Sequence, residues 1–307
     1  MRNQRALPVW RSMLFVPAIS RKFVEGAPQR GADAIILDLE DSVPMAEKPR
    51  ARTLLQDAAM VASQGGADIV VRVNRPLRLA IPDIEAAVSP RVQALALPKI
   101  ESASHLQLLA EIVDEIEGER GMAPGSTKFL AMVETASAFF HMEEIARAHP
   151  RVVALTLGAE DFATSVGMLP EAEGLLFPKQ QMIIAARAAG VMPMGFLGTI
   201  ADFRDLDAFR ATIRRSRRLG FVGAPCIHPS QVPILNEEFA PPADEVSHAE
   251  RVVEAYEKAT AEGVGAIQID GRMIDVPVVE RAQALLARHR AIVARASSTN
   301  DERLNSD

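Results

Sequence analysis

The chain alternates short apolar runs with helix-like segments, and this alternation restricts its fold more than any other feature. Most of the runs are continuously rich in Val, Ile and Leu, as strands buried on both faces are. Strands that alternate with helices predict a parallel sheet. Eight such runs occur: Ser12–Val16, Ala34–Leu39, Ile69–Val73, Ala94–Leu97, Phe129–Val133, Val152–Leu157, Met194–Leu197 and Phe221–Ile227.

Helical patterns separate these strands, and several end at a glycine that can supply a left-handed cap. Eight strand–helix units between residues 12 and 227 favour an α/β fold of the closed (β/α)8 TIM-barrel type over an open doubly wound sheet. The predicted helices are Lys22–Arg30, Glu47–Ser63, Ile84–Val88, Ala103–Glu117, Ala138–Ala148, Lys179–Ala189 and Asp202–Leu219, and the capping glycines are Gly31, Gly66, Gly190 and Gly220.

The pattern changes after the eighth strand, where Pro241 and Pro242 interrupt the chain. Two helices are expected beyond them, Asp244–Glu262 and Pro277–Ala294, followed by a frayed polar tail. We therefore predict a catalytic barrel domain over residues 1–240 and a C-terminal helical extension over residues 241–307. An extension of this length is short for an independent domain but long enough to cover a barrel mouth or to dock on a neighbouring subunit.

Composition excludes several classes of protein. Hydrophobic residues make up 48% of the chain and charged residues 24%, as in globular proteins with a substantial core. The net charge of −6 gives no surface suited to nucleic acid or to an anionic membrane. No apolar run approaches the length of about 18 residues that a membrane span needs. Cys226 is the single cysteine, so no internal disulfide can form, and a reducing, cytoplasmic location is expected.

Two carboxylates follow neighbouring strands of the predicted barrel. Glu134 comes directly after the fifth strand, and Asp161 comes shortly after the sixth. Parallel strands end at the same edge of the sheet, so the two acids should lie close together and repel each other unless a cation lies between them. Carboxylates suit Mg²⁺, which commonly keeps one or two of them and completes its shell with water and substrate. The alternative is that Glu134 begins a helix and Asp161 caps a loop.

Other charged residues are expected at the same end of the barrel, where the chemistry of this fold lies. Arg72 could hold a carboxylate in two hydrogen bonds or form an ion pair with Glu40 or Asp41. Lys99 could form a Schiff base, although an ion pair with an acid of the second strand is the simpler expectation. A general-base role for His228 competes with a structural one. Asp38 should point into the barrel and hydrogen-bond there.

A series of short motifs, in order along the chain, resembles the citrate lyase β-subunit-like branch of the HpcH/HpaI aldolase/citrate lyase family. The resemblance extends from Arg11 to about Arg295. The motifs are Arg11-Ser-Met-Leu-Phe-Val-Pro17, Leu37-Asp-Leu-Glu-Asp-Ser-Val43, Val71-Arg-Val-Asn74, Leu97-Pro-Lys99, Val133-Glu-Thr135, Leu157-Gly-Ala-Glu-Asp161, Asp202-Phe-Arg-Asp205, Leu219-Gly-Phe221, Ile227-His-Pro-Ser-Gln231 and Asp270-Gly-Arg-Met-Ile-Asp-Val-Pro277.

The resemblance implies a TIM barrel that binds Mg²⁺ through Glu134 and Asp161. It also implies that Arg72 and Glu134 contact the substrate, with Arg72 as a catalytic residue. It implies cleavage or formation of a carbon–carbon bond in a 3-hydroxyacyl-CoA, as in citryl-CoA, malyl-CoA or citramalyl-CoA lyases, with a keto acid as the other product. Asp275 matches a catalytic aspartate that relatives often supply from a neighbouring subunit, which implies a homo-oligomer, a trimer or a hexamer.

Further roles and alternatives accompany this expectation. Glu40 and Asp41, with Lys99, would support the metal site from outside the ligand shell. The alternative activities are a thioesterase on the same scaffold, a CoA-independent aldolase that yields pyruvate or oxaloacetate, and a lyase subunit that is inactive without partners.

Overall fold

The computed structural model describes residues 7–199, 205–263 and 265–304, with side chains as far as residue 297. The chain divides into two compact units, Met1–Phe239 and Ala240–Asp307, each of which is described by itself. Asp202, at which a helix and a sequence motif were expected to begin, lies outside the described residues, as do Phe203 and Arg204 of the same motif.

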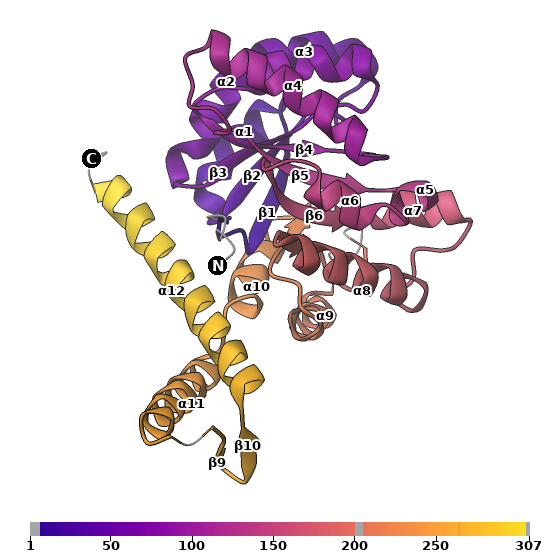
Figure 1. The fold of residues 1–307 in the computed structure, drawn as a ribbon. Coiled ribbons are helices and arrows are strands. Elements are labelled where there is room, and N and C mark those ends of the chain that lie inside the picture. Colours follow the sequence, from indigo (N-terminus) through magenta and orange to yellow (C-terminus); the bar gives the residue numbers. More distant parts are fainter. Residues whose placement is uncertain (1–6, 200–204, 264, 305–307) are drawn as a thin grey trace. The chain divides into compact units, whose positions relative to one another are not determined.

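The first unit is built on a sheet of eight parallel strands, in which each strand pairs with the next one along the chain from β1 to β7, and β8 pairs with β1 (Figure 1). The sheet runs in the order β7-β6-β5-β4-β3-β2-β1-β8. This order confirms the predicted (β/α)8 TIM barrel. The strands are β1 (Ser12–Pro17), β2 (Ala34–Asp38), β3 (Asp68–Arg72), β4 (Val92–Leu97), β5 (Lys128–Val133), β6 (Val152–Leu157), β7 (Met192–Met194) and β8 (Ala224–Cys226).

The barrel closes between its two shortest strands. A bridge joins Met194 to Gly223, and the Gly195 N–H donates to the Gly223 carbonyl oxygen at 2.8 Å. Gly223 has to be a glycine, because a Cβ atom there would lie 1.7 Å from the Trp10 carbonyl oxygen. The seventh strand was expected at Met194–Leu197 and begins two residues earlier. It ends at Met194 because Gly195 and Gly198 adopt φ values of 129° and 150°, outside the range of a strand.

Helices alternate with the strands and pack around them (Figure 1). They are α1 (Arg21–Gly26), α2 (Lys48–Ala62), α3 (Leu77–Ala87), α4 (Ala103–Glu119), α5 (Ala136–Phe139), α6 (Met142–Arg147), α7 (Ala159–Val166), α8 (Ala172–Ala189), α9 (Leu206–Leu219) and α10 (Gln231–Glu238). Short 3-10 turns are η1 (Ala27–Arg30), η2 (Met45–Glu47) and η3 (Ser63–Gly65). The four expected capping glycines all have positive φ.

Several helix predictions need correction, among them that of Lys179–Ala189, because α8 begins seven residues earlier, at Ala172. The segment Ala138–Ala148 is two short helices, α5 and α6, because the backbone leaves the helical conformation at His141 between them. Helix α3 begins at Leu77, well before the expected Ile84, and accommodates Pro82 in its interior. Helix α7, which carries Asp161, was not predicted as a helix.

The core has two layers. Side chains of the strands pack against the surrounding helices, as with Leu37, Leu55 and Ile84. Inside the barrel a smaller cluster includes Met13, Ile36 and Met194, together with Trp10. The Trp10 indole N–H donates to Asp68 at 2.6 Å. The interior is therefore filled below its carboxyl end.

The second unit is a helical pair with a hairpin. Helix α11 (Ala243–Ala261) leads to strands β9 (Ile267–Ile269) and β10 (Arg272–Ile274), which pair antiparallel, and then to α12 (Val276–Leu304). Its own core contains Val252, Ile274 and Val279. Helix α12 extends ten residues past the expected end at Ala294. Within the described ranges, no helix is both long and apolar enough to cross a membrane.

A buried ion pair fixes the amino-terminal ends of β5 and β6. Arg151, which precedes β6, donates to both carboxylate oxygens of Glu117 at 2.8 and 2.6 Å, and both side chains are 1% exposed. The Thr127 and Gly125 N–H groups also donate to Glu117. Burial would raise the pKa of Glu117, but these hydrogen bonds lower it to about 2. The two strands that precede Glu134 and Asp161 are thereby held in place.

We predict that Glu117→Gln destabilises the protein by about 3 kcal/mol or more at pH 7, because it removes the buried charge partner of Arg151 and leaves only Asp114, whose side chain is 53% exposed. Since the pKa of Glu117 is lowered on folding, its contribution exists above the ordinary value of 4.5 and disappears as the pH falls towards 2. Urea unfolding of both proteins across this range measures the difference. Glu115→Gln, an exposed change on the same helix, is the control; an equal loss in both variants would contradict the prediction.

Candidate functional site

A cavity of about 160 Å³ lies at the carboxyl end of the barrel. Its apolar lining includes Phe15, Ile36, Ala96, Leu130 and Met132, which point inward from β1, β2, β4 and β5. Its charged lining consists of Asp41, Arg72, Glu134, Glu160, Asp161 and Lys179. Such a hollow, apolar below and with charges of both signs at its rim, has the form of a site for a small polar molecule.

Glu134 and Asp161 both line this cavity. Glu134 follows β5 and is buried, whereas Asp161 lies in the first turn of α7 with its side chain 45% exposed. Burial, together with the charges of Glu40 and Asp161, raises the pKa of Glu134 to about 8. The two carboxylates are therefore close enough to repel each other, as their positions after neighbouring strands predicted.

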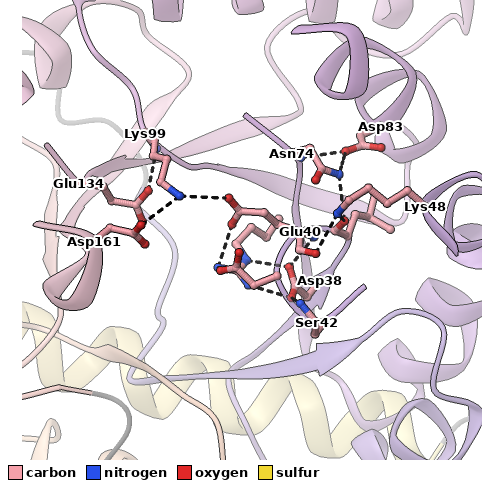
Figure 2. A network of polar contacts seen from close by, with 12 residues as sticks. Asp38, Glu40, Ser42, Lys48, Asn74, Asp83, Lys99, Glu134 and Asp161 are labelled. Atoms are coloured by element: carbon pink, nitrogen blue, oxygen red, sulfur yellow. Dashed lines mark hydrogen bonds and ion pairs between the residues drawn. The ribbon is translucent and has the colours of Figure 1, made fainter. Parts of the chain in front are cut away.

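Lys99 connects the acids (Figure 2). Its ammonium Nζ lies 3.1 Å from Asp161 Oδ1 and 3.8 Å from Glu40 Oε1, and its backbone N–H donates to Glu134 Oε2 at 2.9 Å. Lys99 has a backbone φ of 49°, which is uncommon for residues other than glycine. This conformation turns its N–H towards Glu134. Burial would lower the pKa of Lys99, but the bond with Asp161 and the nearby acids raise it. The expected pair with a strand-two acid is present, and the shorter contact is with Asp161.

Arg72, at the end of β3, is surrounded by acids of β2 and its loop. It donates to both oxygens of Asp38 at 2.7 and 2.8 Å, and its Nη1 lies 3.0 Å from Glu40 and 3.1 Å from Asp41. Burial would lower the pKa of Arg72, but Asp38 and then the other acids raise it. Its guanidinium also lies 4.8 Å from the centre of the Phe15 ring. The ion-pair alternative is thus realised, with the additional partner Asp38.

The loop after β2 is tied down beneath these contacts (Figure 2). Lys48 Nζ donates to the carbonyl oxygens of Leu39 and Glu40, both at 2.9 Å, and the Asn74 side chain donates to Leu39 as well. Burial raises the pKa of Glu40 to about 7, although Arg72 acts in the opposite direction. The loop therefore holds Glu40 in a fixed position, and Lys99 lies between Glu40 and Glu134.

Gly158 fixes the position of the Glu134 side chain from the other side. A Cβ atom at residue 158 would lie 2.5 Å from Glu134 Oε1 and 2.7 Å from its Cγ. The Gly158 N–H donates to the Val133 carbonyl oxygen at 3.0 Å, which draws the two strand ends together. Glu134 is consequently held between a backbone donor, Lys99, and a surface that has room for no side chain.

The donor set fits a hard divalent cation. Among the described residues, no three or more His, Cys, Asp or Glu side chains gather in a way that would hold a metal ion unaided. Glu134 and Asp161 nevertheless offer the one or two carboxylates that Mg²⁺ commonly takes from a protein. A cation between them would relieve the repulsion that raises the pKa of Glu134.

Two further candidate residues belong to other segments of the chain, and one cavity residue was not foreseen. Asp275 belongs to the second unit, where its carbonyl oxygen accepts from the Val278 and Val279 N–H groups at the start of α12. His228 follows β8, and its Nδ1 lies 2.7 Å from the Ser230 hydroxyl. Lys179 lines the cavity from α8. It appears in the sequence as a charged residue of an ordinary helix, so no motif indicated its location.

Comparison with known proteins agrees with this geometry. Residues 11–229 match the HpcH/HpaI aldolase/citrate lyase family. The citrate lyase subunit beta of Leuconostoc mesenteroides subsp. cremoris is 35% identical, over 93% of this chain and 94% of its own. The (3S)-malyl-CoA thioesterase of Cereibacter sphaeroides is 32% identical, over 93% and 96%. The crystal structure of CitE from Mycobacterium tuberculosis, in complex with magnesium, acetoacetate and coenzyme A, superimposes with a TM-score of 0.68 at 29% identity, covering 93% of this chain and 99% of that one.

We predict that Gly158→Ala destabilises the protein by about 1–3 kcal/mol, because the added methyl group overlaps Glu134. Most of this cost should disappear in a Glu134→Ala background, where the overlapping atoms are gone. A double-mutant cycle of unfolding free energies measures the coupling. Gly118→Ala, at an exposed helical position with open space around it, is the control and should be neutral or slightly stabilising. Equal costs of Gly158→Ala in both backgrounds would show that Glu134 is not held in this way.

Proposed function

Because the chain belongs to the HpcH/HpaI aldolase/citrate lyase family, we propose that it is a Mg²⁺-dependent carbon–carbon lyase. It cleaves or forms a 3-hydroxyacyl-CoA, such as citryl-CoA, malyl-CoA or citramalyl-CoA, with an acyl-CoA and a keto acid as the other reactants. The observation that carries this proposal is the convergence of Glu134, Asp161 and Arg72 on one cavity at the carboxyl end of the barrel. The complex of the similar CitE structure with magnesium, acetoacetate and coenzyme A supports it.

Glu134 and Asp161 would hold the metal, and Glu134 would also contact the substrate. When bound, Mg²⁺ supplies a Lewis acid that polarises the hydroxyl and carboxylate oxygens of the substrate. Lys99 keeps both ligands in place, one through its N–H and the other through its ammonium group. Glu40 and Asp41 would orient water around the site, as residues outside a ligand shell commonly do.

Arg72 would orient the substrate beside these ligands. Its partners Asp38 and Glu40 are buried, whereas the Asp41 side chain is 67% exposed. A substrate oxygen can therefore replace Asp41 at the guanidinium without uncovering a buried charge. Fixing the substrate in this way aligns the bond to be broken. In the synthetic direction Asp275 would remove the α-proton of the acyl-CoA as a general base.

We propose that the enzyme is a cytoplasmic homo-oligomer, a trimer or a hexamer, in which Asp275 acts in its own or a neighbouring subunit. Its ligands are a small keto acid and a CoA thioester, without nucleic acid or membrane. Cys226 is the single cysteine, so no internal disulfide can form, and this supports a reducing location.

A thioesterase is the second candidate, because a relative of similar identity is a (3S)-malyl-CoA thioesterase. A screen of hydroxyacyl-CoA thioesters with Mg²⁺ separates the two activities, provided that keto acid and free thiol are measured independently. Keto acid without thiol release supports the lyase. Thiol release without keto acid supports the hydrolase. Turnover of a free hydroxy acid would replace both with an aldolase.

We expect Glu134→Gln and Asp161→Asn each to lower Mg²⁺-dependent turnover by more than about 1000-fold, because a metal that polarises substrate oxygens is worth several kcal/mol. Calorimetric titration with Mg²⁺ should show weakened binding while the circular dichroism spectrum is unchanged. Glu143→Gln, which removes an exposed partner of Arg147, is the matched control. Full activity in both site variants would remove the metal from the mechanism.

Asp275→Asn should lower kcat of the synthetic direction by about 100- to 10,000-fold, the usual worth of a general base. Mg²⁺ affinity should stay the same, because the residue is not proposed as a ligand. The measurement is exchange of the acyl-CoA α-proton with solvent in the presence of a keto acid. Asp270→Asn, which removes the partner of Arg251 in the same unit, controls for damage to the hairpin. Unchanged exchange in Asp275→Asn would make this residue structural.

A further inference from the structure

Lys179 is a buried cation that the proposed chemistry leaves unused. Its side chain extends from α8 to the cavity and is 3% exposed. The ammonium group donates to the carbonyl oxygen of Phe196 at 2.5 Å and to that of Gly198. In the part of the chain that the structure describes, no carboxylate forms an ion pair with Lys179, whereas Arg72 and Lys99 each contact at least two.

The barrel places Lys179 across the cavity from Arg72. Lys179 is bonded to the segment that follows β7, and Arg72 ends β3. These two strands are four positions apart in the order of eight, which is half of the way round a closed barrel. Glu134 and Asp161, after β5 and β6, lie on the wall between them. A molecule held by this wall therefore has one cation on each side.

The surroundings of Lys179 favour an incoming anion. Burial lowers the pKa of Lys179 to about 7, and the charge of Glu160 acts in the opposite direction. Glu160 is exposed on α7, where solvent screens it. A buried ammonium without an ionic partner is costly, and a carboxylate at hydrogen-bond distance would offset that cost. An ammonium has three N–H donors, and the two carbonyl oxygens occupy two of them.

We propose that Lys179 is a specificity-determining residue that binds the second carboxylate of a keto acid carrying a carboxylate at each end. This inference rests on the proposed function, since the metal ligands and Arg72 must first hold the other end of the molecule. The enzyme would then act on the hydroxyacyl thioester that yields a dicarboxylic keto acid, such as oxaloacetate, in preference to one that yields pyruvate. The apolar residues that line the cavity offer no partner to a second carboxylate, so the preference for a dicarboxylic keto acid depends on Lys179.

The test compares binding of oxaloacetate and of pyruvate to the full-length protein in Mg²⁺, by isothermal titration calorimetry. Wild-type protein should bind oxaloacetate at least about 10-fold more tightly than pyruvate, because a charged hydrogen bond is gained. Lys179→Met should weaken oxaloacetate binding by about 10- to 100-fold and leave pyruvate binding within about two-fold. Lys179→Gln keeps an N–H donor for the carbonyl oxygens without the charge, and should lose the same preference.

Arg187→Gln is the matched control, because Arg187 also joins α8 to a backbone carbonyl oxygen, that of Gly220 at 2.9 Å, and does so without lining the cavity. It should keep the preference for oxaloacetate. Equal binding of the two keto acids by wild-type protein would overturn the inference whether or not the variants fold. An equal loss of both ligands in the Lys179 variants would do the same and would assign the residue a structural role. Wild-type protein that binds neither keto acid would overturn the proposed function, and this inference with it.

Discussion

Repulsion between carboxylates at the carboxyl end of the barrel is the interaction on which the site depends. Parallel strands bring Glu40, Glu134 and Asp161 together because consecutive strand ends meet at one rim. Lys99 and Arg72 neutralise part of this charge, but Glu134 remains buried with a raised pKa. A divalent cation would complete the neutralisation that the two side chains begin.

Rigid backbone elements keep these charges at fixed distances. The left-handed conformation of Lys99 directs its N–H to Glu134, and Gly158 leaves room for that carboxylate on the other side. At the opposite end of the strands, Arg151 and Glu117 hold β5 and β6 in register. The proposed metal ligands are therefore positioned by contacts above and below them, so little reorganisation would be needed for a cation to bind.

Much of the barrel and of the acid cluster could be predicted from the sequence, because both follow from periodicity. Apolar runs such as Val152–Leu157 predict strands. A residue directly after a strand, such as Glu134, is then expected at the carboxyl-end rim of the barrel. Contacts that depend on the direction of a side chain could not be predicted. The pairing of Arg72 with Asp38 is of this kind, because Asp38 was expected to hydrogen-bond inside the barrel but its partner was not identified. Lys179 was missed because it lines the cavity from helix α8, whereas only residues that follow strands were considered as rim residues.

The barrel is joined least firmly where β7 meets β8, through a single bridge and strands of three residues each. The segment that accepts the hydrogen bonds of Lys179 begins at this seam, while Glu134 and Asp161 follow β5 and β6, which pair over five positions. Substitutions around Phe196 can thus alter which acid is accepted without disturbing the wall that would bind the metal. In evolutionary terms, a fold arranged in this way can exchange one substrate for another while its chemistry is inherited unchanged.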